Sequence, residues 1–378
     1  MVTSTRTADL TTRRERLLNY ITVRHAHMVP LVSVLPRETT THTVTEHIVD
    51  APFASGDSIR AINTPHANSR LEGADFTDVD IGQPTRLRCI TEIKHRAAKM
   101  VGSAIPAVIA GADNPWDLNT GKLFTQLINE LDNTAMYGMG SPETAGHTTN
   151  PRQMLGMVGW AAVTGLERMH GSGVPDAITD PYGVNIPKAY WSVFYDADHK
   201  NLTSDLMFNN IMVPLLRNGA QMSGDRGWTW MVGYQLMGRI SRFINPEGYV
   251  TLETKNRDAD SSKGSDHMTV FRFPTGEIAT FMTNRWLDVH DLTYSWSTTD
   301  PVSPGTPTSP GTVAAKTFDG NATMIGWEPG RARMLYYRDP AFRKIETAGD
   351  FSRVAALLEA TVQVDSPLCI GGGGNLLA

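Results

Sequence analysis

Histidine and aspartate side chains are the first candidates for chemistry, because both commonly bind metal ions in proteins. His25 and His27 form an HxH pair that would face one side of a strand. The sequence contains no HExxH motif and no further ligand spaced to complete a tetrahedral zinc site. Asp196, Asp198 and His199 form a short cluster that is more typical of a solvated turn. The sequence therefore predicts no metal site.

Other motifs resemble binding or catalytic loops but lack essential residues. Residues 258–264 (DADSSKG) resemble a calcium loop, yet Lys263 stands where glycine is needed and Thr269 where a bidentate glutamate is needed. The glycines at 371–374 lack the GK[ST] ending of a phosphate loop, and no GxSxG nucleophile elbow occurs. We therefore predict no catalytic residue and no cofactor.

One enzymatic interpretation of the sequence stays open, a hydrolase that acts on carbohydrate. A carbohydrate hydrolase would use paired carboxylates and stacking tryptophans, and the chain has eight tryptophans. They are spread from Trp116 to Trp327, which fits core and interface packing better than one sugar site. A deep acidic cleft in a soluble monomer would favour the hydrolase.

Composition indicates a globular protein with one elaborate domain or a few lobes. The chain has 378 residues, of which 40% are hydrophobic and 19% charged, and its net charge is −5. Proteins that bind nucleic acid over a broad face are usually basic, so sequence readout is not expected. Cys89 and Cys369, the only cysteines, fit synthesis in a reducing cytoplasm. We expect no secretory signal in residues 1–10 and no membrane-spanning segment.

The elements that must position functional side chains begin with an extended hairpin. Residues 41–50 are rich in β-branched side chains and predict a strand. Residues 85–94 predict the return strand, with Leu87, Cys89, Thr91 and Ile93 on one face and Arg86, Arg88, Glu92 and Lys94 on the other. Between them lie more than thirty residues without a strong period. We expect an arm that reaches another molecule.

A long helix is predicted next, over 116–137. Asn114 can cap it, and Pro115 suits the first helical position. Apolar residues recur at helical spacing from Leu123 to Ala135, and the helix would be roughly 30 Å long. Residues 141–200 are turn-rich, and we expect them to be irregular.

The later elements suggest a second lobe of mixed α/β character. The patterns predict a helix over 202–216 interrupted at Pro214, a buried strand over 228–232 and a helix over 234–244. Strands at 268–273 and 277–283 flank a Pro-Thr-Gly turn and predict a hairpin.

The last third of the chain contains a proline run and two late strands. Prolines recur every third residue from Pro301 to Pro310, which favours polyproline II in a stiff solvated loop. Residues 331–338 and 354–364 predict strands, with a helix as the alternative for the second. Strands near both termini must share one core, so we expect an interleaved fold.

Two further segments complete an ordered series. Residues 28–35 (MVPLVSVL) place a proline before apolar residues, and 72–75 (EGAD) place an acidic–glycine motif in the long loop. With the elements above and the closing strand after Gly349-Asp350, this order from Val29 to Gly373 resembles the major capsid proteins of tailed bacteriophages with the Hong Kong 97 fold. No single motif is specific, but their order is. The turn at 217–220 holds fewer glycines than the family's, and 297–312 resemble an insertion.

The resemblance implies an α+β, Hong Kong 97-like fold. Its parts would be an N-terminal arm (1–40), an extended loop (41–95), a peripheral domain with a long spine helix (96–140), an axial domain (141–250) and further peripheral strands with a Pro-rich insertion (251–378, insertion 297–312). The implied function is structural and not enzymatic. The alternative within this class is another virion protein, such as a tail tube or fibre, although a fibre should show internal repeats and none is evident. Copies would form hexamers and pentamers of an icosahedral head that encloses double-stranded DNA, assembled in the host cytoplasm.

The resemblance also implies contacts and partners. Glu72, Asp75, Arg86, Arg88 and Lys94 are candidate inter-subunit contacts; the alternative is solvated edge charges that discourage sheet aggregation. An inter-subunit disulfide between the two cysteines stays open, although a reducing cell disfavours it. Expected partners are further copies of the chain, a portal, a decoration protein, DNA held without sequence readout and, because only about forty mostly irregular residues precede the loop, a separate scaffolding protein. No membrane partner is expected.

Overall fold

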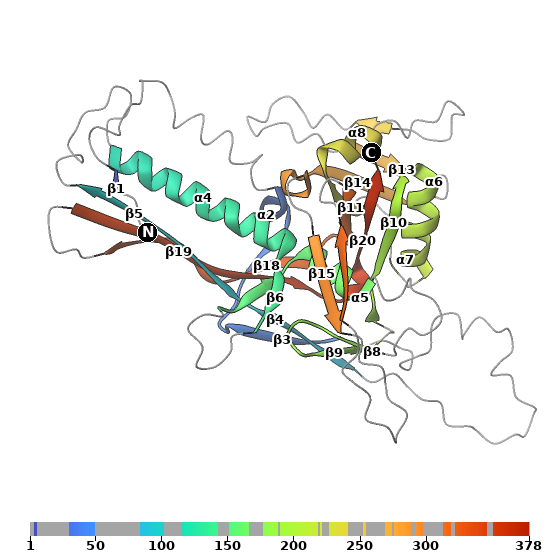
Figure 1. Cartoon of the computed structure of the whole chain (residues 1–378), viewed down its shortest axis with the longest axis horizontal. Coiled ribbons are helices and arrows are strands. Elements are labelled where there is room, and N and C mark those ends of the chain that lie inside the picture. The colour runs from blue at the N-terminus through green and yellow to red at the C-terminus, as the bar shows by residue number, and fades with distance from the viewer. Residues whose placement is uncertain are drawn as a thin grey trace, which may run out of the picture.

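A computed structural model shows an elongated molecule in which a long sheet with one long helix joins a more compact lobe (Figure 1). The described residues are 4–5, 30–49, 84–101, 115–142, 151–165, 177–187, 190–217, 220, 227–240, 252–254, 269–273, 276–288, 292–297, 313–318, 322–345 and 351–377. Outside these ranges lie the histidine pair, the motif at 72–75, residues 218–219 of the turn at 217–220, the calcium-like run and the proline run. None of the described helices is long and apolar enough to cross a membrane.

The long sheet has five strands in the order β1-β5-β19-β18-β2. They comprise Ser4–Thr5 (β1), Glu92–Val101 (β5), Phe351–Val364 (β19), Ala332–Ile345 (β18) and Arg37–Thr39 (β2). β19 is antiparallel to both β5 and β18, so segments more than 250 residues apart in sequence form one sheet. The predicted late strands are confirmed and the helical alternative for 354–364 is wrong, because pairing with two neighbours outweighs the helix propensity of alanine and leucine.

Helix α4 (Pro115–Tyr137) lies along this sheet (Figure 1). It confirms the predicted long helix, and proline occupies its first position. Leu123, Leu127 and Leu131 are buried, as their helical spacing predicts. The helix ends before Gly138, where a Cβ would lie 2.8 Å from the Thr134 carbonyl oxygen.

The compact lobe is built on a mixed seven-stranded sheet in the order β10-β20-β17-β11-β14-β13-β12. Its strands are Val193–Asn201 (β10), Ile370–Leu377 (β20), Met324–Trp327 (β17), Trp228–Val232 (β11), Ile278–Thr283 (β14), Thr269–Arg272 (β13) and Leu252–Thr254 (β12). The predicted strand over 228–232 and the hairpin β13–β14 are confirmed. Gly276 in that turn has φ +100°, a conformation that glycine adopts without strain.

A helical run packs against the glycine-rich strand β20. It comprises α6 (Ser204–Leu206), a π-helix η5 (Met207–Met212) and α7 (Val213–Arg217), and Thr203 caps its start. A Cβ on Gly371 would lie 2.8 Å from Leu215 Cδ1, so glycine permits the close approach. The predicted interruption at Pro214 is wrong. Proline lacks an N–H and clashes with a carbonyl in a regular helix, and the wider π-turn that precedes it keeps the run continuous.

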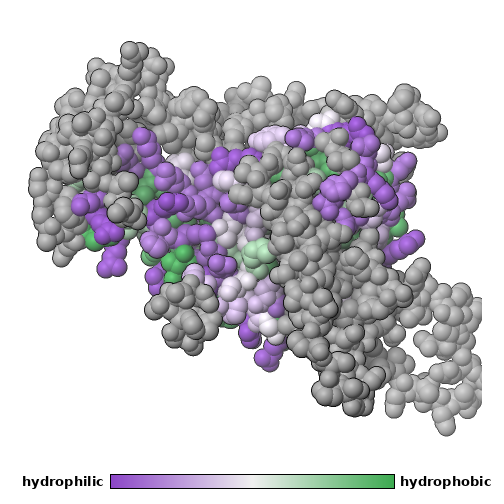
Figure 2. Space-filling view, in the orientation of Figure 1, coloured by the Kyte–Doolittle hydropathy of each residue, from purple (hydrophilic) through white to green (hydrophobic). Residues whose placement is uncertain are grey.

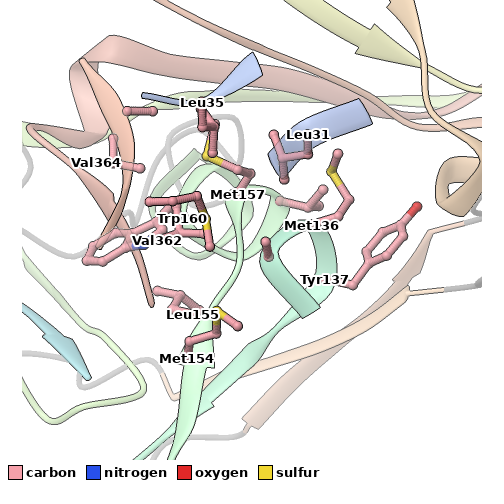
Figure 3. Packing of buried hydrophobic residues seen from close by; sticks show 14 of the residues in the cluster. Leu31, Leu35, Met136, Tyr137, Met154, Leu155, Met157, Trp160, Val362 and Val364 are labelled. Atoms are coloured by element: carbon pink, nitrogen blue, oxygen red, sulfur yellow. The ribbon is translucent and has the colours of Figure 1, made fainter. Parts of the chain in front are cut away.

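Residues 141–200, predicted to be irregular, contain several regular elements. These include the buried helix α5 (Met157–Gly165), the ribbons β6–β7 (Met139–Ser141, Gln153–Leu155) and β8–β9 (Ala177–Thr179, Asn185–Pro187), and strand β10. The prediction is wrong because α5 is apolar almost all round and shows no helical period. Figure 3 shows Met157 and Trp160 of α5 packed among Leu31 of α2 (Pro30–Val34), Met136 of α4 and Val362 of β19.

The predicted single strand over 85–94 is in fact two strands in two sheets. β4 (Thr85–Ile90) pairs with β3 (Val44–Val49), which confirms the first arm strand, whereas β5 belongs to the long sheet. Beyond Thr91 the predicted facing is wrong: Ile93 is 43% exposed, while Lys94 is mostly buried. The chain changes sheets at Thr91, whose N–H donates to the Thr43 carbonyl at 2.9 Å.

Two elements remain, a short helix and a pair of strands that the sequence did not predict. Helix α8 (Tyr234–Ile240) confirms the start of the predicted third helix. The Pro-rich segment connects two antiparallel strands, β15 (Leu292–Ser297) and β16 (Val313–Phe318). A long segment between paired strands fits an insertion into a hairpin.

Candidate functional site

The two-stranded ribbon β3–β4 presents one covered and one open face. Leu87 and Cys89 are buried on the covered face. On the open face, Ile48 is 68% exposed and Val44 is 44% exposed. Isolated exposed apolar residues are common, but two on one narrow ribbon provide an apolar contact surface.

Charged residues lie between these apolar side chains on the open face. Arg88 Nη2 lies 2.8 Å from Glu46 Oε1, and Arg86 Nη1 lies 3.9 Å from Glu46 Oε2. Cross-strand register places Glu46 opposite Arg88 and Ile48 opposite Arg86. Both predicted contact arginines therefore lie on the open face and already have an acidic partner in their own chain.

The other predicted contact residues are not part of this cluster. Lys94 pairs with Glu92 in β5, and both side chains are mostly buried. Glu72 and Asp75 lie outside the described residues. The structure thus brings Arg86 and Arg88 together and separates Lys94 from them.

A buried carboxylate, missed from the sequence, holds the base of the ribbon. Glu359 is fully buried in β19 and forms an ion pair with Arg152. Its Oε1 also accepts a hydrogen bond from Thr91 Oγ1 at 2.7 Å, and Arg152 Nε donates to the Thr91 carbonyl at 2.8 Å. Arg338 Nε lies 3.4 Å from the other carboxylate oxygen. In the sequence, Glu359 is a single acidic residue in a mostly apolar strand pattern, and this signal could have indicated a buried carboxylate.

A second charged group joins the ribbon to the end of the long sheet. Arg333 pairs with Asp365 and with Glu38 of β2, the latter at 2.9 Å. His47 Nε2 donates to the Asp365 carbonyl at 3.1 Å. Burial lowers the pKa of His47, so the ring is favoured in its neutral form. These contacts fix the covered face of the ribbon against the sheet.

Asp132 of α4 is a further buried carboxylate. It accepts hydrogen bonds from the Val32 N–H at 2.8 Å and from Trp286 Nε1 at 2.9 Å. Trp286 lies in the 3₁₀ helix η6 (Arg285–Asp288), directly after β14 of the compact lobe. Burial raises the pKa of Asp132 to about 7, despite these bonds and the nearby Arg285. Asp132 therefore links α2, α4 and the compact lobe.

The two cysteines are free thiols. Burial raises the pKa of Cys89 and of Cys369 to about 12. Neither thiol is therefore activated as a nucleophile. Cys89 is 1% exposed, so a bridge to another subunit would require the ribbon base to open.

Hydrophilic side chains dominate the described surface on one face of the molecule. Figure 2 shows hydrophilic side chains over much of the described surface on the face drawn, with apolar ones in small groups. Among the described residues, no group of three or more His, Cys, Asp or Glu side chains is placed to hold a metal ion. The charged clusters around Glu359, Arg333 and Asp132 instead connect separate helices and strands of the fold to one another.

Comparison with solved structures shows the fold. A capsid protein of cyanophage A-1(L) superposes with a TM-score of 0.56 at 11% identity, covering 92% of this chain and 93% of that one. A chain of Mycobacterium phage Patience gives 0.51 at 9% identity over 99% and 93%, and the capsid of a native GTA particle gives 0.51 at 11% over 93% and 91%. The fold is therefore the expected α+β, Hong Kong 97-like capsid fold.

Sequence comparison shows the family. The search of curated proteins gave no match. The family model described as SU10 major capsid protein matches residues 2–376, almost the whole chain. Members of such a family are structural and not enzymatic, which confirms the predicted class and sets the hydrolase aside. The chain belongs to the SU10 major capsid protein family and is a structural component of the phage capsid.

Proposed function

We propose that copies of this chain form hexamers and pentamers of an icosahedral head, held together by the arm of residues 41–95. The observation that carries the proposal is the open face of the ribbon β3–β4, where Val44 and Ile48 are exposed although they lie in a regular strand. Burial of these side chains against a neighbour would contribute about 25 cal/mol per Å² of apolar surface.

In this proposal each lobe of the molecule corresponds to one domain of the capsid fold. The long sheet with α4 as its spine helix is the peripheral domain, drawn from residues 96–140 and from β18 and β19. The seven-stranded sheet is the axial domain around each symmetry axis; it takes residues 141–250 and also the strands β12, β13, β14, β17 and β20. Residues 1–40 form a separate N-terminal arm, and the segment 297–312 is an insertion between the paired strands β15 and β16.

Other partners follow from the same role. A portal, a separate scaffolding protein and a decoration protein would act on the assembled shell, and packaged DNA would lie against it without sequence readout. The net charge of −5 supports the last point, because strong binding to DNA phosphates requires clustered cations.

The test removes the arm without disturbing its base. Val49 and Thr85 lie opposite each other in the ribbon register, so residues 50–84 can be replaced by a two-residue Asn-Gly turn. We expect the shortened chain to fold as a monomer but to yield no capsomers, tubes or shells in light scattering and negative-stain microscopy, with scaffold co-expressed if the full chain needs it.

A point variant provides the matched comparison. Ile48→Asp should reduce assembly, whereas Thr45→Ser, on the covered face, should not. A full chain that stays monomeric even with scaffold would contradict the capsid proposal, and a shortened chain that forms uniform shells would contradict the role of the arm.

A further inference from the structure

The ribbon β3–β4 carries one histidine, and it lies on the covered face. His47 of β3 is opposite Leu87 in the cross-strand register, and the next pair along the same face joins Thr45 to Cys89. Leu87, Cys89 and Val49 at the end of β3 are buried. An ionisable ring therefore lies among apolar side chains, where a positive charge would lose much of its hydration.

The hydrogen bonds of the His47 ring favour its neutral form. Nε2 lies 3.1 Å from the carbonyl oxygen of Asp365, and a carbonyl can only accept, so Nε2 carries the ring proton. Nδ1 is buried, and no described residue forms a hydrogen bond with it. Protonation would place a second N–H at Nδ1 and a positive charge on the ring. A buried N–H without an acceptor is costly, so the charged ring fits this position poorly.

Charged groups on several elements surround the covered face. Asp365 follows β19, and its carboxylate pairs with Arg333 of β18. Because Arg333 already neutralises that carboxylate, Asp365 attracts a charge on His47 less than a free acid would. Arg333 itself repels such a charge. The other ionisable groups around the covered face are Arg331, Glu38, Asp180, Tyr182 and Cys89, whereas Glu46, Arg86 and Arg88 lie on the open face.

The balance of these effects sets the sign of the pH dependence. Burial lowers the pKa of His47 below its usual value of 6.5, although the carbonyl and the carboxylate of Asp365 and the Val364 carbonyl raise it; Arg333 lowers it further. The closed ribbon therefore binds fewer protons than an opened ribbon, in which water surrounds the ring. The contact is most stable above about pH 6.5 and weakens as the pH falls through that value.

The base of the ribbon is held by separate contacts. The Thr91 N–H donates to the Thr43 carbonyl at 2.9 Å, and Glu359 and Arg152 bind Thr91 to the long sheet. His47 lies four residues beyond Thr43, about 13 Å away along an extended strand. The bonds at Thr91 do not involve the His47 ring, so the ribbon can open at His47 while its base stays joined.

We propose that His47 is a proton-sensitive latch for the ribbon. Its neutral ring holds β3–β4 on the end of the long sheet, and its protonation in mild acid releases the ribbon around the base at Thr91. The release is a property of the single chain and is independent of the proposed assembly. Since Val44 and Ile48 are exposed on the open face, the latch would fix the direction in which that contact surface points.

Labelling of Cys89 tests the release in the full-length chain. Cys89 is 1% exposed, so a reagent reaches its thiol only when the covered face opens. Cys369→Ser leaves Cys89 as the single thiol, and dithiodipyridine reacts with thiols in acid as well as at neutral pH. We expect the labelling rate, divided by that of N-acetylcysteine at the same pH, to be about fivefold or more higher at about pH 5 than at about pH 7.5. Equal normalised rates at the two pH values would overturn the proposal.

Two glutamine variants assign the effect to one ring. His47→Gln keeps an N–H donor for the Asp365 carbonyl but cannot take up a proton, and we expect its normalised labelling rate to be the same at both pH values. His42→Gln replaces an exposed histidine just before β3 and should keep the pH dependence of the parent chain. If acid still increases the labelling of His47→Gln, another group controls the release and the latch is contradicted.

Tryptophan fluorescence separates local release from unfolding of the whole chain. Trp228 and Trp230 are buried in the compact lobe, and tryptophan emission should stay unchanged while Cys89 becomes reactive. A change of emission and of labelling with the same pH midpoint would mean that the chain unfolds as a whole, without a latch.

A second variant is available if His47→Gln does not fold. Arg333→Gln removes the cation that opposes a charge on His47, so the ratio of the normalised labelling rates in acid and at neutral pH should become smaller. An undiminished ratio would contradict the proposed electrostatics. None of these outcomes bears on the capsid role, which is tested by assembly of the unmodified chain.

Discussion

The two sheets of this molecule bury their residues in different ways. Consecutive residues are buried in the seven-stranded sheet, including all of β11 and β17. In the outer half of the long sheet, β19 alternates between buried and half-exposed positions. A sheet covered on both faces leaves no face for another molecule, whereas a sheet covered on one face does. The comparison shows that the compact lobe is filled by its own side chains, whereas the outer half of the long sheet keeps partly exposed positions on β19.

The largest expected effect tests the stability of the compact lobe. Trp230 is fully buried in β11 and packs beside Trp228, with ring centroids 5.9 Å apart. Trp230→Ala should cost about 3–5 kcal/mol of unfolding free energy, because the cavity adds to the lost apolar burial. Urea denaturation measures this, with Leu357→Ala on the half-exposed face as the comparison. Equal losses of unfolding free energy in Trp230→Ala and Leu357→Ala would contradict the difference in burial between the two sheets.

The next effect concerns the ion cluster at the ribbon base. Glu359→Ala leaves Arg152 without its buried partner and should cost about 3 kcal/mol. Arg338→Gln removes a partner whose side chain is 53% exposed and should cost less than about 1 kcal/mol. Thermal melting of both variants checks the ranking. A larger loss for Arg338→Gln would mean that Arg338, and not Arg152, carries the cluster.

A pH effect is expected where the two lobes meet. The pKa of Asp132 is raised to about 7, above the usual carboxyl value of 3.8, so between these pH values the folded protein binds more protons than the unfolded one. The contribution of Asp132 to the unfolding free energy should therefore fall as pH rises from about 4 to 7. Denaturation of Asp132→Asn across this range should show a flatter dependence than the unmodified chain. An identical slope would show that Asp132 does not titrate there.

The smallest effect is expected on the open face of the ribbon. The Arg86 side chain is 75% exposed and lies 3.9 Å from Glu46, so Arg86→Ala should change the unfolding free energy by less than about 0.5 kcal/mol. If Arg86→Ala nevertheless reduces assembly, the reduction would come from a lost contact between subunits and not from lost folding stability. A loss above 1 kcal/mol would show that the ribbon depends on this pair for folding.

The sequence by itself determined the elements with strong local signals. Helix α4 follows from its apolar spacing and its first proline, β11 from a short apolar run, and the β13–β14 hairpin from a turn that needs glycine. Their order also sufficed for the family resemblance. These predictions succeeded because neighbours along the chain supply the deciding forces.

The tertiary structure alone decided which distant segments meet. The change of sheets at Thr91, the carboxylate of Glu359 beside Arg152 and the bonds of Asp132 to α2 and η6 join residues from 61 to 268 positions apart. No local period encodes such pairs, because their stability comes from burial that exists only in the folded chain. The helix α5 was hidden for a related reason: an element buried on every side shows no periodic contrast.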